Sequence, residues 1–433
     1  MILTHPSLRR VMARRQEEFR ALAAQSAQVV LAAAVVGAVT GLGVAGIERV
    51  VVDGGLAAVR AAPLWVMAAA PCLGLVVAAV LLRTVGGGVS PSTSDEYLRA
   101  FHDSRVQLPW RALVARITAS VATLGFGGAM GLEGPSLYLD ATLGAQAQRR
   151  LPRVFQRADH RVLMTAGAAA GVAAIFKAPA TGAIFALEVP YQDDLARRML
   201  LPALVGSAVS YLTFVAVNGT APLFPIIGNP TFDFRDLAGA VILGIVAGIA
   251  ARIFAFLLRR AKALSRFGAP VRNLAAGVVL AGVFVAGWAL TGESLTIGPG
   301  YDAIDWALDP RHATWLVFVV LGLRCAATVA TVAGGGAGGL FVPLVVGGAL
   351  LGRAVGGAVH GLDTSLFVVV GVSAFLGAGY RVPLAAVMFV AEATGRPGFV
   401  VPGLLAAVAA ELVMGRSSVT TYQRTAESEA TGV

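Results

Sequence analysis

Six long apolar stretches divide the chain and restrict it to a helical membrane fold. They lie near residues 27–47, 61–82, 162–187, 236–258, 273–291 and 313–333. Each approaches or exceeds the roughly 20 residues that a helix needs to cross a bilayer. Inside lipid every backbone polar group must bond within the protein, and a helix does this within one segment. We therefore predict an all-α integral membrane protein.

Composition and charge support this class. Of 433 residues, 57% are hydrophobic and 13% are charged, which is too apolar for a soluble domain. The net charge is +10, but the basic residues form short clusters between apolar stretches, as in cytoplasmic loops, so no nucleic-acid partner is expected. We predict a multi-pass protein of the cell membrane. Its predicted flanking segments are a cytoplasmic amphipathic lead at 1–27, without a cleaved signal peptide, and a short tail at 415–433.

The chain repeats itself. "VATLGFGGAMGLEGPSLYLDATLGA" (121–145) aligns without gaps with "VATVAGGGAGGLFVPLVVGGALLGR" (329–353), and 12 of the 25 positions are identical. Further along, "GAAAGVAAIFKAPATGAIFALE" (167–188) aligns with "GVSAFLGAGYRVPLAAVMFVAE" (371–392). A fixed internal spacing of this kind indicates a duplicated architecture. The predicted membrane repeats span residues 28–220 and 236–414.

Both repeat cores contain a glycine-rich break followed by a proline. Glycine runs destabilise a continuous helix, whereas proline fits the first turn of a new one. Pro135 and Pro343 occupy equivalent positions, so each half is expected to start a helix there. Free N–H groups at a helix start bind anions, and repeat transporters hold substrate near the bilayer midplane. The sequence predicts an anion site between the two starts; the alternative is that the glycines only allow close helix packing.

Glu133 is the exception to this symmetry, since the second half has Phe341 at the equivalent position. A charged side chain at membrane depth costs about 2.5–3.5 kcal/mol on insertion scales and marks an ion or proton pathway. A carboxylate beside an anion site can occupy that site itself, and protonation would remove this competitor. We predict that Glu133 is a gate and a proton acceptor.

The motifs resemble those of the CLC family of voltage-gated chloride channels and chloride/proton antiporters. "GLEGP" (131–135) is similar to the family's G-[KR]-E-G-P motif, and "GGLFVP" (338–343) to its G-x-F-x-P motif. The resemblance covers nearly the whole chain and fits the prokaryotic type without CBS domains. It implies two inverted-topology repeats of tilted and re-entrant helices. It also implies a homodimer with one pore per subunit that moves chloride or a similar anion, with or without protons, through the lipid bilayer.

The resemblance assigns roles to individual residues. Glu133 corresponds to the external gating glutamate. Leu132 stands where the family usually has Lys or Arg, so a positive charge near the outer ion site is missing. Gly-Pro follows Glu133, and fluoride selectivity is therefore not expected. The backbone ligands of the anion are predicted at Leu132, Gly134, Leu340, Phe341 and Val342.

Two side-chain ligands of the anion are less firmly placed. The family's G-S-G-I-P motif is absent, and its region reads "GGGVSPSTSDEYL" (86–98). Counting back from Glu133 places the motif's hydroxyl at Ser92, whereas a gap would place Gly88 there. "STSDE" also has the capping-box spacing of a helix N-terminus, so its hydroxyls either cap a helix, bind the anion or do both. For the family's coordinating tyrosine the candidate is Tyr422, whose alternative role is an interfacial anchor.

Val189 decides between two mechanisms. Antiporters of this family usually relay protons through an internal glutamate at this position, directly after the residue matching Glu188. Glu188 itself is mirrored by Glu392, and a symmetric pair is more typical of structure than of a relay. We therefore predict a passive chloride channel with a glutamate gate. The alternatives are a chloride/proton antiporter with weak or atypical coupling and a transporter of another small solute.

Enzymatic chemistry is not predicted. The five histidines have no H-E-x-x-H or comparable spacing, and two cysteines are too few for a metal site. We expect no catalytic residues, no metal and no cofactor. The apolar segments near 200–217 and 398–414 are expected to form the dimer interface, by resemblance to the family.

Overall fold

The computed structural model describes residues 6–150, 159–221, 223, 232–309, 311–359 and 364–425, with side chains from residue 27 onward. The side chains of the predicted Arg-rich lead and the end of the tail at 426–433 lie outside this description. The first half contains α1 (Pro6–Glu48), α2 (Ala57–Arg60), α3 (Leu64–Thr84), α4 (Ser94–His102), α5 (Trp110–Gly125), α6 (Glu133–Arg150), α8 (Arg161–Phe176), α9 (Pro179–Glu188) and α10 (Leu200–Asn218). The second half contains α11 (Phe234–Ala263), α12 (Ala269–Thr291), α13 (Tyr301–Leu308), α14 (Thr314–Ala333), α15 (Phe341–Ala358), α16 (Thr364–Tyr380), α17 (Pro383–Thr394) and α18 (Val400–Met414).

The protein is an all-α integral membrane protein, as predicted. Among the described residues, eight helical segments are long and apolar enough to cross a membrane. The predicted stretch at 162–187 is wrong as a single crossing, because it divides into α8 and α9. Lys177 adopts a left-handed backbone with φ 52°, and Pro179 then starts the next helix. Hydropathy alone could not reveal this break, since both helices are apolar.

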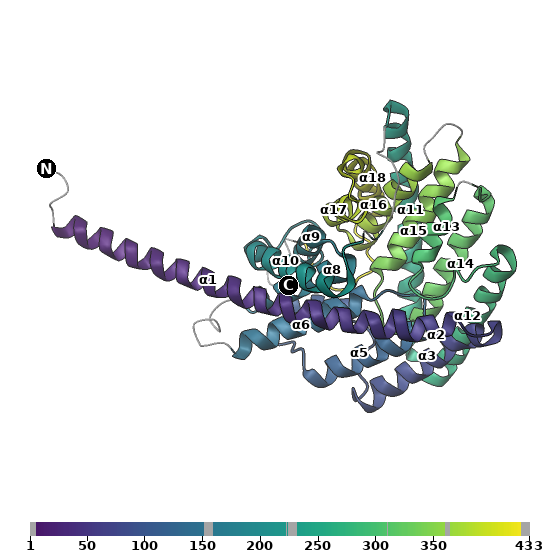
Figure 1. The fold of residues 1–433 in the computed structure, drawn as a ribbon, viewed down its shortest axis with the longest axis horizontal. Coiled ribbons are helices and arrows are strands. Elements are labelled where there is room, and N and C mark those ends of the chain that lie inside the picture. The colour runs from purple at the N-terminus through teal and green to yellow at the C-terminus, as the bar shows by residue number, and fades with distance from the viewer. Residues whose placement is uncertain are drawn as a thin grey trace.

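The two halves are related by a local two-fold axis. Gly131 and Gly339, which are equivalent in the repeat, form an antiparallel bridge with N···O distances of 3.0 and 2.7 Å. The bridge lies where the glycine-rich segments meet, directly before α6 and α15. Figure 1 shows the purple-to-teal first half and the green-to-yellow second half packed side by side. The fold is thus two inverted-topology repeats that meet at their broken helices.

Hydrogen bonds between the halves come in reciprocal pairs. The Ala129 N–H donates to Thr331 Oγ1 at 3.2 Å, and the equivalent Ala337 N–H donates to Thr123 Oγ1 at 3.1 Å. Each half therefore supplies the side-chain acceptor for the other half's glycine-rich segment. The unpaired backbone that a helix break creates is satisfied across the axis, as a membrane interior requires.

Candidate functional site

The starts of α6 and α15 meet in the protein interior. Glu133 begins α6 and is 3% exposed, and Phe341 begins α15 and is fully buried. A Cβ added to Gly134 would lie 2.8 Å from Gly339 Cα, so the two backbones are in contact. The predicted convergence of two helix starts is therefore present in the structure, with their positive ends at one point.

The Glu133 carboxylate occupies the start of α15. Its Oε1 accepts hydrogen bonds from the Phe341 N–H at 2.6 Å and the Val342 N–H at 3.3 Å. Its Oε2 is buried and has no hydrogen-bond partner among the described residues. A side chain on Gly339 would collide with this carboxylate, which explains the glycine there. The negative group of the first half thus lies on the backbone N–H groups that begin α15 in the second half.

An aromatic cluster encloses Phe341. Phe176 stacks on it with ring centroids 4.2 Å apart, and Phe185 and Phe389 meet it edge-on at 5.4 and 5.1 Å. The Tyr380 ring lies 6.4 Å away. Ring edges carry partial positive charge and the surrounding rings exclude water. The start of α15 therefore lies in an apolar setting in which its N–H groups interact strongly with an anion.

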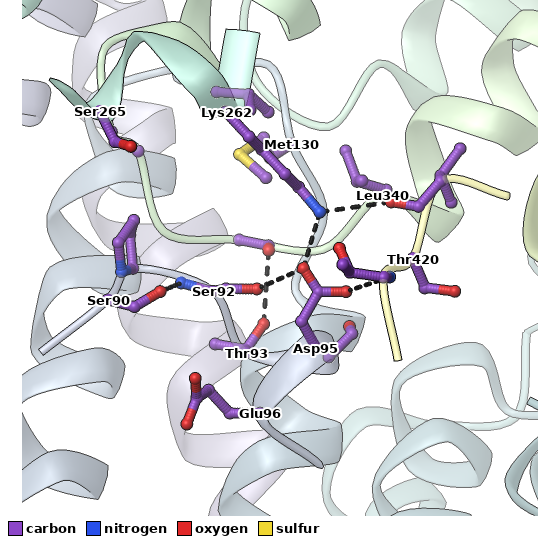
Figure 2. A pocket seen from close by; sticks show the side chains of 18 of the residues that line it. Ser90, Ser92, Thr93, Asp95, Glu96, Met130, Lys262, Ser265, Leu340 and Thr420 are labelled. Carbon is purple, nitrogen blue, oxygen red and sulfur yellow. Dashed lines mark hydrogen bonds and ion pairs between the residues drawn. The ribbon is translucent and has the colours of Figure 1, made fainter. Parts of the chain in front are cut away.

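A cavity of about 320 Å³ leads toward this point. Figure 2 shows its walls, formed by the start of α4, the end of α11 and the C-terminal segment. Leu340 and Tyr380 line it, directly beside the residues that hold Glu133. The Thr93 hydroxyl, buried at its edge, donates to the Gly338 carbonyl at 3.4 Å. The cavity thus reaches Leu340, the first of the backbone ligands predicted in the second half.

Both acidic and basic side chains line the cavity. Lys262 Nζ contacts Asp95 Oδ2 at 2.7 Å and donates to the Val419 carbonyl at 3.3 Å, which fixes the C-terminal segment against α4 (Figure 2). The Thr421 N–H donates to Asp95 Oδ1 at 3.0 Å. Arg272 also lines the cavity, and it forms no salt bridge with any described residue. Because Asp95 and Glu96 line the cavity together with Lys262 and Arg272, the formal charges of its lining balance.

The structure separates the predicted ligands into two groups. The backbone set predicted for both halves lies around the Glu133 carboxylate. Ser92 and Tyr422 instead line the cavity. Ser92 Oγ donates to Asp95 Oδ2 at 3.1 Å, and Thr93, the N-cap of α4, makes no capping hydrogen bond with its side chain. The capping box read from "STSDE" is therefore absent, and Ser92 and Tyr422 stay predictions as anion ligands.

Two residues near the site were missed by the sequence analysis. The Tyr380 side chain lies close to Ser94 and Leu340. Both residues line the cavity. A signal was available for Tyr380, because the repeat aligns it with Phe176 and it is the polar member of the pair. For Ser94 the only available signal was its position in the hydroxyl-rich stretch.

Glu188 and Glu392 form a reciprocal pair. Glu188 accepts from the N–H groups of Leu384 and Ala385 at 3.1 and 2.9 Å, at the start of α17. Glu392 accepts from the N–H groups of Ala180 and Thr181 at 2.9 and 2.7 Å, at the start of α9. Each carboxylate thus caps a helix of the other half and stabilises its positive end.

Comparisons with known proteins agree with this architecture. Residues 73–415 match the family model described as voltage gated chloride channel. The chain is 28% identical over 371 residues to the chloride channel protein ClcB-like of Ralstonia nicotianae, covering 82% of this chain and 84% of that one. It is 27% identical over 405 residues to the H(+)/Cl(-) exchange transporter ClcA of Citrobacter koseri, covering 89% and 85%. The structure of a slow cyanobacterial Cl-/H+ antiporter superposes with a TM-score of 0.79 at 21% identity, covering 89% and 94%.

The match extends over most of the chain and includes both helix starts. The chain therefore belongs to the voltage-gated chloride channel family, CLC, whose members move anions across membranes. Its fold is shared with solved CLC antiporters.

Proposed function

We propose that this protein exchanges chloride for protons and that Glu133 serves both ions. One observation carries the proposal: the Glu133 carboxylate lies on the Phe341 and Val342 N–H groups at 2.6 and 3.3 Å. A backbone site of this kind binds a carboxylate or a halide through the same donors. Chloride and the deprotonated side chain therefore compete for one position.

Protonation of Glu133 changes this competition. A neutral carboxyl interacts weakly with the positive end of α15, so the side chain leaves and chloride takes its place. When the proton is released, the carboxylate returns and expels the anion. Chloride thus occupies the site only while Glu133 carries a proton. When chloride leaves to one side of the membrane and the proton leaves to the other, one cycle moves the two ions in opposite directions.

The exchange proposal differs from the passive channel predicted from sequence. That prediction depended on Val189, which lacks a titratable group. One relative is named a channel and another an exchange transporter, and the superposed solved structure is that of an antiporter. These names favour the alternative of weakly or atypically coupled exchange over the passive channel. At the inner end of the site, the Tyr380 and Ser94 hydroxyls would close the path from the cavity and prevent free chloride flow.

Reversal potentials test the proposal. The purified protein is reconstituted in liposomes under opposed chloride and pH gradients. Exchange predicts a reversal potential between the chloride and proton Nernst values, and uphill proton movement driven by chloride. A reversal potential that follows the chloride value and ignores the pH gradient would establish a passive channel instead. Replacing potassium chloride by potassium gluconate serves as the control for anion selectivity.

A further inference from the structure

A second buried acid lies on the helix that starts at Glu133. Asp140 follows Glu133 by seven residues on α6. Seven residues make almost two full turns, so both side chains leave nearly the same face of the helix, about 10 Å apart along its axis. α6 runs from the anion site toward its basic end at Arg149 and Arg150. Asp140 therefore lies between the Glu133 site and the end of the helix.

Asp140 is isolated from other charges. It is 0% exposed, and neither carboxyl oxygen has a hydrogen-bond partner among the described residues. The Thr40 hydroxyl of α1 lies beside it without hydrogen-bond geometry. No charged or titratable group of the described elements packed against α6, which include α1, α4, α5, α8 and α15, interacts with it. An unpaired carboxylate in such a place is costly, so the group is stable there when it carries a proton.

The absence of a side chain at Gly171 makes room for the Asp140 carboxyl. On α8, a Cβ at Gly171 would collide with Asp140 Oδ2 and would lie 2.8 Å from the Ser136 carbonyl. Ser136 is one helical turn from Glu133 and one turn from Asp140, and its buried hydroxyl donates to the Leu132 carbonyl at 2.9 Å. A polar row of Glu133, Ser136 and Asp140 thus follows one face of α6.

The fold itself does not require this acid. The equivalent position in the second half is Gly348, which packs against the Gly371 carbonyl as α6 packs against α8. The other acid near the expected inner proton path is Glu188. Each of its carboxylate oxygens accepts a hydrogen bond from a backbone N–H group at the start of α17, so it caps that helix. Asp140 is the buried carboxyl on α6 that has no structural partner.

We infer that Asp140 is the inner proton-transfer group of this transporter, receiving the proton that Glu133 releases and passing it along α6, or the reverse. The inference rests on the proposed chloride/proton exchange. The proton moves from one carboxyl to the other through Ser136 or water, with no bond change other than O–H transfer. The row on α6 thereby takes the place of a titratable side chain at Val189.

Paired flux measurements test the inference. Proton and chloride fluxes are recorded from the same liposomes for the wild type, Asp140→Asn and the matched control Thr40→Val, which removes the neighbouring hydroxyl but no titratable group. We expect Asp140→Asn to lower proton flux about a hundredfold, the lower end of what a positioned proton-transfer group contributes, while chloride flux persists. Thr40→Val should keep both fluxes and their ratio.

Three outcomes would overturn the inference, and they are distinguishable. Wild-type protein that moves chloride but no protons would defeat the proposed exchange together with the inference. Proton flux in Asp140→Asn at the wild-type ratio would defeat the inference alone. Loss of both fluxes in Asp140→Asn and also in Asp140→Gly, which installs the residue of the second half, would show a structural role. An infrared difference band of a titrating carboxyl that disappears in Asp140→Asn would support the inference independently of transport.

Discussion

At the scale of single residues, the polar side chains assigned a role are those that differ between equivalent positions of the two halves. Glu133 is equivalent to Phe341, Tyr380 to Phe176, and Asp140 to Gly348. In each pair one half has an apolar or small residue, whereas the other has a buried polar side chain. An evolved two-fold scaffold becomes directional through such exceptions, because a symmetric site cannot treat the two faces of a membrane differently.

Glu133→Gln should remove the pH dependence of chloride transport. In the wild type, transport should rise as the pH falls, because protonation frees the start of α15. The neutral amide mimics the protonated state at every pH, so chloride flux should be as fast or faster and constant. Chloride efflux from liposomes over a pH series measures this. Glu96→Gln, which alters another acid on the cavity wall, is the control and should keep the wild-type profile. A normal pH profile in Glu133→Gln would contradict the gating role.

Tyr380→Phe should weaken chloride binding without unfolding the protein. The phenyl ring keeps its packing near Phe341, but the hydroxyl beside Leu340 and Ser94 is lost. One hydrogen bond of ~1 kcal/mol corresponds to about fivefold in affinity. Calorimetric titration with chloride measures the change. The control is Tyr97→Phe, another fully buried tyrosine, whose hydroxyl donates to the Ala186 carbonyl at 3.4 Å. Equal affinity of Tyr380→Phe and wild type would remove the tyrosine from the site.

The sequence could predict that the two helix starts meet at Glu133, but not that Tyr380 and Ser94 lie near them. The ligands around Phe341 follow from a local motif, because a glycine break and a proline define a helix start without distant contacts. Tyr380 and Ser94 come from α16 and α4, and their approach to Leu340 depends on how those helices pack. The prediction of Ser92 depends on counting along one segment, which does not decide which hydroxyl of the turn would face an anion, so Ser92 stays a prediction.

At the scale of the element, the broken helices depend on one another across the two-fold axis. The ends of α9 and α17 carry the carboxylates that cap each other's starts. The alignment of the two halves could predict that Glu188 and Glu392 are equivalent. This symmetry indicated a structural role rather than a proton relay. The break inside 162–187 escaped prediction because it depends on the left-handed backbone of Lys177, which has an equivalent in Arg381 with φ 59°.

Removing one cap should destabilise the fold without changing ion coupling. Glu392 accepts from two backbone N–H groups and from the Thr181 hydroxyl at 2.6 Å, whereas Glu188 accepts from two N–H groups. We expect Glu392→Gln to cost about 1–3 kcal/mol, the range for a charged hydrogen-bond network, and Glu188→Gln to cost less. Thermal unfolding in detergent measures both.

The control for this prediction is the ratio of proton flux to chloride flux in Glu392→Gln and Glu188→Gln. It should equal that of the wild type, since neither carboxylate is assigned to the proton path. A changed ratio in Glu188→Gln with unchanged stability would instead make Glu188 a relay.

For the whole molecule, the last helices of the two halves lie in one row of packed helices. α10, α9, α17 and α18 pack in sequence, so the last helix of each half flanks the capped pair. Large apolar side chains project from the two flanking helices, including Leu212 at 61% and Leu412 at 79% exposure. The resemblance to the CLC family predicted a homodimer through this face, at residues 200–217 and 398–414. We propose that assembly, with a separate anion site in each subunit.

Leu412→Trp should shift the protein from dimer to monomer while each subunit continues to transport. A homodimer interface between apolar helices depends on close packing, and an indole near the C-terminal end of α18 would hold the two copies apart. The exposed Val278 on α12 lies outside this row of helices, so Val278→Trp is the control and should remain dimeric. Subunit counting by single-molecule photobleaching in bilayers measures the state of both variants and of the wild type. Because the anion site is built from the two halves of one chain, monomeric Leu412→Trp should keep chloride flux per subunit. A monomeric wild type would refute the dimer, and a monomeric variant without flux would show that the site needs the second copy.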